Sequence, residues 1–215
     1  MCWDMYNPPH FASTDLNWLD WLAEHHPFCT LVSQVDGDPF ASHLPVLYTR
    51  TDDQVLITGH WARPNAQWRD IENQRVMLLF HGPHAYVSPR WYADAPKQVP
   101  TWNYVTAHVY GRLVVHDDPA WTEDLVRRLT TKHEAYRDHP WSVDDAPRPF
   151  IEGQLRAIVG IELEITRIEA KAKLSQNRPA ADVEGVIAGL RERGDKEMAD
   201  AVEEATADAV ARARS

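Results

Sequence analysis

The sequence predicts an α+β fold in which mostly antiparallel strands curl into a barrel and helices lie at its periphery. Apolar and polar side chains alternate strongly over residues 158–168, the pattern of a strand with one buried face. The turn Asp-Gly-Asp-Pro at residues 36–39 separates two apolar runs and predicts a hairpin. Residues 180–213 are rich in Ala, Glu, Asp and Arg, which favours a helical C-terminal segment.

The remaining elements follow from local signals along the chain. Residues 13–15, Ser-Thr-Asp, offer caps for a first helix that ends before Pro27. Pro119 suits the first turn of an amphipathic helix that extends to about Tyr136. Two helices around Gly194 are expected in the C-terminal segment. The other expected strands are 28–35, 40–48, 54–59, 75–81, 84–88 and 102–116, and short helices are expected at 64–71 and 151–157.

Composition limits the classes of function. The formal net charge is -10, and an acidic surface repels phosphate backbones, so direct binding of DNA is disfavoured. The two cysteines, Cys2 and Cys29, cannot form a disulfide framework. No apolar run approaches the ~20 residues of a membrane span, and no signal-peptide pattern is evident. We therefore expect a cytoplasmic protein that makes no membrane contact.

Residues 82–104 combine aromatic rings with small polar side chains and several prolines. A plain core strand needs neither the prolines nor so many rings with polar tips. A flat, partly polar cofactor needs stacking faces and nearby groups that orient it by hydrogen bonds. The stretch therefore predicts one wall of a pocket for a planar cofactor. Its rings and polar side chains include Tyr86, Ser88, Trp91, Tyr92, Trp102, Asn103 and Tyr104.

The segment 59–68 is expected to carry a strand through a loop into a short helix. Backbone N–H groups at a helix start bind anions. Arg63 could add a bidentate contact to a phosphate, with a hydrogen bond from Asn65 or His60. The same segment fits an ordinary strand–helix corner with a solvated Arg63 equally well.

Two more segments offer groups to a ligand. Pro45 cannot donate to a sheet ladder, so the backbone of residues 42–44 either meets a ligand or forms a plain strand edge. In the polar segment 171–179, Lys173 could reach a phosphate or a carboxylate. The neighbouring residues 175–177 could contact the same ligand or cap the next helix.

Histidine is abundant, with 11 residues, but no zinc-binding motif accompanies it. We therefore expect no metal site. No side chain stands out as a general acid or base, so the catalytic residues are left open. His43, His60 and His84 are the first to test.

Taken together, these motifs resemble the PaiB-like proteins, a family of FMN-binding negative transcriptional regulators. The resemblance extends from about residue 6 to about residue 192. The matching motifs are residues 8–11, 42–45, 60–65, 82–89, 99–104 and 173–178.

The resemblance implies a split β-barrel like that of pyridoxamine-phosphate oxidases, assembled as a homodimer with FMN between the subunits. The flavin ring would lie along residues 42–46, the phosphate near residues 60–65, and residues 84–104 would wall the site, partly from the partner. We expect a cofactor-binding barrel domain over residues 1–178 and a helical appendage over residues 179–215. The function implied is a flavin-dependent oxidoreductase or a flavin-sensing regulator. A barrel that dimerises without any cofactor is the third possibility.

The sequence also resembles the piperazate synthases, which use haem b to form an N–N bond. That resemblance would make His60 the axial ligand of the haem iron. Haem needs a strong axial ligand, whereas FMN needs an anion site for its phosphate. Arg63 and Asn65 beside a helix start favour FMN. The candidate cofactor-binding residues are Ser42, His43, Leu44, His60, Arg63, Asn65, Ser88, Trp91, Trp102, Asn103, Lys173, Ser175 and Gln176.

Overall fold

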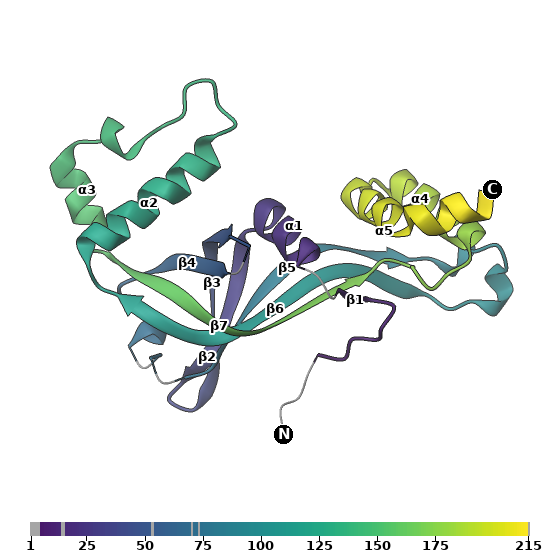
Figure 1. Ribbon diagram of the computed structural model, residues 1–215, viewed down its shortest axis with the longest axis horizontal. Coiled ribbons are helices and arrows are strands. Elements are labelled where there is room, and N and C mark those ends of the chain that lie inside the picture. The colour runs from purple at the N-terminus through teal and green to yellow at the C-terminus, as the bar shows by residue number, and fades with distance from the viewer. Residues whose placement is uncertain (1–4, 14–15, 53, 70, 73, 215) are drawn as a thin grey trace. The chain divides into compact units, whose positions relative to one another are not determined.

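The computed structural model describes residues 5–13, 16–52, 54–69, 71–72 and 74–214 (Figure 1). Within these ranges, no helix is both long and apolar enough to cross a membrane. The helices are α1 (Asn17–His25), α2 (Pro119–Glu134), α3 (Arg148–Leu155), α4 (Ala180–Arg193) and α5 (Lys196–Arg214). The strands are β1 (Ala12–Ser13), β2 (Phe28–Val35), β3 (Asp38–Arg50), β4 (Val55–Ala62), β5 (Val76–Val87), β6 (Thr101–His116) and β7 (Ile158–Lys173).

The strands form one sheet in the order β1-β7-β4-β3-β2-β5-β6, and β7 also pairs with β6. That extra pairing closes six of the strands, β2 to β7, into a ring. The registered pairs β2–β3, β2–β5, β3–β4, β4–β7 and β1–β7 are all antiparallel. The predicted α+β split barrel with peripheral helices and a C-terminal helical segment is therefore confirmed.

The chain divides into two compact units. The described residues of Met1–Leu19, His81–Ala107 and Glu169–Ser215 form the first unit. The second unit consists of those in Asp20–Phe80 and His108–Ile168. The domain boundary predicted at residue 178 stays a prediction.

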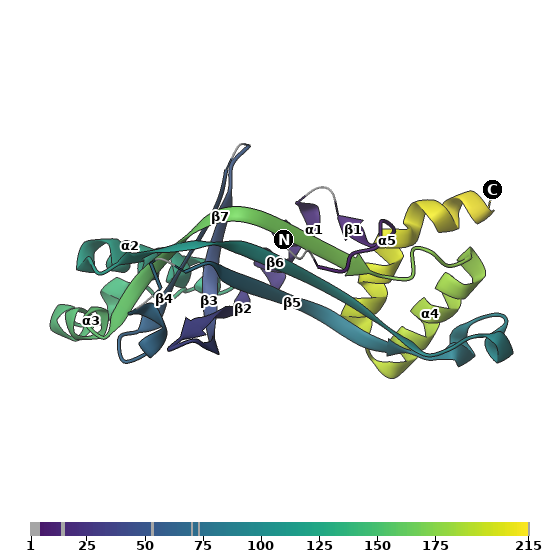
Figure 2. The ribbon, with the colours of Figure 1, turned by 90° about the horizontal axis from the view of Figure 1, so that it is seen from below.

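The second unit contains the predicted hairpin. Val35 pairs with Asp38, and the two residues between them, Asp36 and Gly37, have φ angles of 53° and 87°. Positive φ at both central residues is the geometry of a two-residue type I′ turn, which suits the twist of paired strands. Leu47 on β3 packs with buried side chains of α2, so this helix covers the hairpin. Figure 2 shows α2 beside α3, and both helices contribute to a second apolar cluster.

The first unit contains the two predicted C-terminal helices. α4 ends at Gly194, whose φ of 88° is the left-handed conformation common after a helix. α4 also packs against the turn that carries Trp91. A Cβ atom added to Gly189 would lie 2.3 Å from the Trp91 ring, so a side chain there would displace the ring. α4 therefore packs this closely against Trp91 only because residue 189 has no side chain.

Three expectations about the strands and turns were wrong. The expected strands 75–81 and 84–88 are a single strand, β5. Pro83 does not interrupt it, because the ladder recorded between β5 and β2 covers only residues 77–79 and needs no N–H from residue 83. β7 continues to Lys173, beyond the predicted strand 158–168, so residues 171–173 of the polar segment lie on a strand. The expected helix 64–71 is a three-residue 3-10 turn, Ala66–Trp68. The expected caps at residues 14 and 15 lie outside the described residues, as does the side chain of Ser13.

The docking of α4 can be tested with Gly189→Ala. We expect this change to lower the free energy of unfolding by roughly 1–2 kcal/mol, because overpacking outweighs the better helix propensity of Ala. Gly153→Ala on α3 is the matched control, since the nearest atom to its added Cβ is 3.9 Å away. Urea unfolding of both variants measures the difference. Equal effects of the two substitutions would rule out the close α4–Trp91 contact.

Candidate functional site

β3 and β4 diverge at Pro45. Residues 46–50 of β3 pair with residues 55–59 of β4, whereas residues 38–45 pair with β2. In the described part of the chain no pairing joins residues 38–45 to β4, and β4 continues instead against β7 through residues 60–62. Pro45 has no N–H to donate, so the ladder loses nothing by ending there. The open strand edge predicted around residues 42–44 is thus present.

A hollow of about 410 Å³ lies where the two strands separate. Its volume is within the usual range of ligand pockets. Five of the candidate residues meet there, from β3, β4 and the following turn. The lining residues are Phe40, Ala41, Ser42, His43, Leu44, His60, Trp61, Ala62 and Asn65. We call this the β3–β4 hollow.

The corner after β4 is fastened to the hairpin by side chains. Asn65 donates from Nδ2 to the Ser42 hydroxyl at 2.7 Å, and its Oδ1 accepts from the backbone N–H of Gln67 at 2.9 Å. Gln67 is 1% exposed and donates from Nε2 to the Ser33 hydroxyl at 2.9 Å. These contacts hold residues 42 and 65 at one side of the hollow. They also use the N–H at the start of the 3-10 turn, which was expected to meet a phosphate.

Two buried nitrogen atoms at the β3–β4 hollow have no hydrogen-bond partner among the described residues. They are Nε1 of Trp61 and Nδ1 of His60. Trp61 is only 3% exposed, and an unpaired buried N–H is costly unless an acceptor reaches it. Burial also lowers the pKa of His60, so its imidazole is neutral at pH 7. Both residues border the hollow, so its wall contains one unpaired buried donor and one neutral imidazole.

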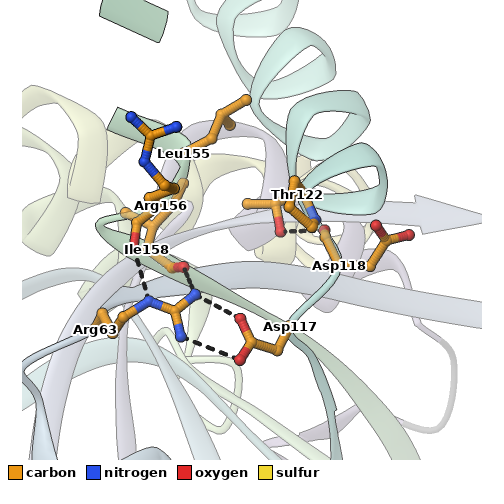
Figure 3. Close-up of a pocket in the computed structure, with 8 residues that line it drawn as sticks. Arg63, Asp117, Asp118, Thr122, Leu155, Arg156 and Ile158 are labelled. Carbon is orange, nitrogen blue, oxygen red and sulfur yellow. Dashed lines mark hydrogen bonds and ion pairs between the residues drawn. The ribbon is translucent and has the colours of Figure 1, made fainter. Parts of the chain in front are cut away.

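Arg63 lies at a different pocket, shown in Figure 3. Its Nε donates to the carbonyl of Arg156 at 2.7 Å, and one terminal nitrogen donates to the carbonyl of Ile158 at 3.1 Å. Both terminal nitrogens bind the Asp117 carboxylate. This ion pair lowers the pKa of Asp117 and raises that of Arg63. Most of the Arg63 donors thus bind protein groups, and its role toward a phosphate stays a prediction.

The first unit brings together a second set of candidate residues. Lys173 donates from Nζ to the Trp102 carbonyl at 2.6 Å. Asn103, 1% exposed, donates from Nδ2 to the Ser175 hydroxyl at 3.0 Å. Gln176 bridges its own loop, because Oε1 accepts from the backbone N–H of Leu174 at 2.8 Å and Nε2 donates to the Ala172 carbonyl at 2.6 Å. Ser175 has a φ of 67°, a conformation that non-glycine residues seldom adopt.

Three neighbouring cations of this unit, all close to one loop, have no carboxylate partner among the described residues. Lys171 is 5% exposed and donates from Nζ to the Tyr6 carbonyl at 2.6 Å. Arg178 donates from its NH1 nitrogen to Oε1 of Gln98 at 2.9 Å. The pKa of Lys173 is lowered by burial and by the charges of Lys171 and Arg178. We call Lys171, Lys173 and Arg178 the cation cluster; in an acidic protein, such a group is suited to an anion.

Ser88 and Trp91 have structural contacts. The Ser88 hydroxyl accepts from the backbone N–H of Arg90 at 3.2 Å and so caps the turn that follows β5. Trp91 packs against α4, as described above. Trp102 is 52% exposed, with its ring centroid 6.1 Å from that of His84 and 6.2 Å from that of Tyr86. A cofactor role for these residues stays a prediction.

Sequence reasoning missed Trp61, Gln67 and Asp117. Trp61 stands inside the motif 60–65, and its type alone could have drawn attention to it. Gln67 and Asp117 carried no signal, because their roles depend on contacts with distant residues. Among the residues that the structure describes, no three of His, Cys, Asp and Glu converge in a way that could hold a metal ion.

Comparison with known proteins identifies the family. A family model described as "Putative FMN-binding domain" matches residues 5–167. The chain is 37% identical over 204 residues to "Protease synthase and sporulation protein PAI 2" of Bacillus subtilis (strain 168), which covers 93% of this chain and 97% of that protein. It is 28% identical over 230 residues to the uncharacterized protein AN0679 of Emericella nidulans, covering 88% of this chain and 92% of that protein. These matches confirm the predicted resemblance.

Solved structures share the fold at low sequence identity. The flavocytochrome Anf3 from Azotobacter vinelandii has a TM-score of 0.54 at 15% identity, covering 75% of this chain and 69% of that chain. The FAD and haem binding protein from Mycobacterium smegmatis has a TM-score of 0.52 at 18% identity, covering 75% and 73%. Protein Rv2991 from Mycobacterium tuberculosis has a TM-score of 0.56 at 12% identity, covering 81% and 94%.

The lowered pKa of His60 predicts how stability depends on pH. Unfolded His60 takes up a proton near its ordinary pKa of 6.5, whereas the folded side chain resists protonation. Protons therefore favour the unfolded state, and the free energy of unfolding falls as the pH drops below that value. Between about pH 7.5 and about pH 5.5, we expect His60 to account for a loss of at most about 1.4 kcal/mol.

Urea unfolding at the two pH values measures this loss, which we expect to shrink in His60→Gln. His43→Gln is the control, because His43 is exposed on the same hollow. An identical pH dependence in the wild type and His60→Gln would contradict the assignment.

Proposed function

Because the chain belongs to the FMN-binding domain family just described, we propose that it binds FMN non-covalently in the β3–β4 hollow. The observation that carries this proposal is the unpartnered N–H of the buried Trp61 beside five of the candidate residues. A flavin ring has oxygen and nitrogen acceptors at its edge, and a tryptophan N–H is a donor only. The unpaired edge of β3 around residues 42–44 adds backbone groups in the same place.

FMN, when bound, supplies redox chemistry that the side chains themselves lack. The residues of the hollow would bind and orient it. Ser42 and Asn65 are already fixed to each other by a hydrogen bond, so they present a rigid edge. His60 stays neutral at pH 7 and can donate or accept a hydrogen bond at Nδ1, according to its tautomer.

Two places suit the phosphate of FMN. Arg63 has the right chemistry, but most of its donors bind Asp117 and backbone carbonyls. The cation cluster, represented by Lys173, has no carboxylate partner in the described chain. We propose that Arg63 or Lys173 contributes to phosphate binding, and affinity measurements on variants of each residue, taken by itself, distinguish them.

The proposed role is that of a flavin-dependent redox or sensing protein that forms a homodimer. Val99 is 70% exposed and Trp102 is 52% exposed, and large apolar side chains at a surface suit burial by a partner. The name of the Bacillus relative concerns protease synthesis and sporulation. A net charge of -10 opposes direct contact with DNA, so any regulatory role would act through a small molecule or a protein partner.

One observation favours a second candidate, a haem-dependent enzyme of the piperazate-synthase type. His60 is a partly buried, neutral imidazole, which is the form that binds iron. Two proteins of the same fold are named for haem or cytochrome content. Against this candidate, a ligating histidine usually donates its other N–H to an acceptor, and Nδ1 of His60 has no such partner in the described structure.

The absorption spectrum of the purified protein decides between the two cofactors. We expect the two visible and near-ultraviolet bands of oxidised flavin, either as purified or after titration with FMN. A strong Soret band would support haem instead, and a protein that gains neither signal would refute both. Sedimentation velocity of the same sample tests the homodimer, which a monomeric species with and without FMN would contradict.

Variants at the two anion candidates locate the phosphate. Loss of a charge-assisted hydrogen bond should weaken FMN binding by roughly 1.5–3 kcal/mol, in Arg63→Ala or in Lys173→Ala but not in both. Asp117→Asn is the matched control, because it breaks the ion pair and keeps the Arg63 charge.

If Arg63 binds phosphate, Asp117→Asn should leave the FMN affinity unchanged or improve it. If Arg63 only stabilises the fold, Arg63→Ala and Asp117→Asn should both lower the free energy of unfolding and leave the FMN affinity unchanged. Fluorescence titration of FMN and urea unfolding separate these outcomes. Unchanged affinity in both Arg63→Ala and Lys173→Ala would exclude the two candidates together.

A further inference from the structure

A second hollow, of about 310 Å³, lies on α2 and shares His60 with the β3–β4 hollow. None of the expectations drawn from the sequence involved it. Its lining comes from the middle of β3, from the last part of β4, from one face of α2 and from the loop after that helix. The lining residues are Pro45, His60, Val126, Leu129, Thr130, His133, Glu134 and Trp141. We call this the α2 hollow.

The α2 residues of this lining form one helical stripe. Val126, Leu129, Thr130, His133 and Glu134 recur at spacings of three and four residues, which places them on one face of the helix. The inner part of this stripe is core, since Leu129 is 6% exposed and packs with Leu47 and Leu125. The outer part is the wall of the α2 hollow. The helix that covers the hairpin therefore also supports the hollow.

His60 joins the two hollows. It follows Gly59, the last β4 residue that pairs with β3, so the strand has already lost that neighbour at position 60. His60 lines both hollows, and its Nδ1 is buried without a hydrogen-bond partner in the described structure. A molecule in the α2 hollow and one in the β3–β4 hollow would both lie beside this residue.

The walls of the α2 hollow indicate the chemistry of its ligand. Pro45, Val126, Leu129 and Trp141 supply apolar surface. Glu134 supplies a carboxylate whose Oε2 accepts from the backbone N–H of Trp141 at 3.2 Å and pairs with Nε of Arg137 at 3.1 Å. Neither contact uses Oε1. An apolar body with one amino group matches this combination of walls and acceptor.

We propose that the α2 hollow binds a small organic amine with an apolar body and holds it against His60. Its further role, as the pocket of a second ligand beside the flavin, rests on the proposed FMN site. The binding of the amine itself does not, because no residue of the α2 hollow other than His60 lines the β3–β4 hollow.

Two consecutive threonines provide a matched test. Thr130 lines the α2 hollow, and Thr131 is exposed outside it. Thr130→Trp should fill the hollow, whereas Thr131→Trp places the same ring on the solvent face. The probe is 4-fluorobenzylamine, followed by fluorine NMR on the FMN-free protein. Glu134→Gln keeps the size of the side chain and removes its charge.

We expect the wild type and Thr131→Trp to bind the probe with equal affinity and Thr130→Trp to lose at least about tenfold. Glu134→Gln should weaken binding of the amine about tenfold, as expected for loss of one charge-assisted hydrogen bond. Binding of 4-fluorotoluene, which has no amino group, should be unaffected. Equal binding by Thr130→Trp and Thr131→Trp would overturn the proposal. So would the absence of wild-type binding up to about 10 mM probe, well above the millimolar affinity of a weak fragment.

The flavin arm of the experiment is separate. Adding the probe to the FMN-loaded wild type should change the flavin fluorescence, and the change should vanish in Thr130→Trp. Amine binding with no flavin response would overturn the placement beside the flavin. A protein that binds the amine and never binds FMN would refute the proposed function and leave the amine site standing.

Discussion

The separation of β3 from β4 at Pro45 is the constraint on which the site depends. A buried strand edge must find partners for its N–H and C=O groups, so strands in a barrel rarely part without compensation. Proline removes one donor at the point of separation, and β2 and β7 satisfy the two strands on their other sides. The hollow is thus built by the hydrogen-bond pattern of the sheet.

An opening of this kind would collapse unless its rim were held. Asn65 and Gln67 fasten the corner after β4 to the hairpin, and Arg63 ties the same corner to Asp117 and to β7. Asn65 and Arg63 are largely satisfied by these contacts, and Gln67 uses its amide donor although its Oε1 has no partner among the described residues. Two residues predicted for a phosphate site, Arg63 and Asn65, thus also hold the hollow in shape.

The sequence allowed much of this fold to be predicted, because the signals were local. The turn at residues 36–39 and Pro45 identified the hairpin and its open edge. Trp61 was missed because the side chains of neighbouring strand residues such as His60 and Trp61 are expected on opposite faces of the sheet. In the structure both residues border the hollow. Asp117 lies 54 residues from Arg63, so no local pattern could have paired them. β7 was cut short although Ala and Lys continue the alternation over residues 170–173, because both residue types are uncommon in strands.

The geometry at His60 follows from the same separation. Because position 60 is the first beyond the β3–β4 ladder, its side chain has open space on the side that β3 leaves. α2 covers the hairpin through Leu125 and Leu129, and this helix encloses a second space next to the imidazole. One break in a strand ladder and one packed helix thus produce two hollows that share a residue. When a titratable side chain lies between two ligand-sized spaces, a ligand in one space can change the protonation or the orientation of that side chain. The change then affects binding in the other space.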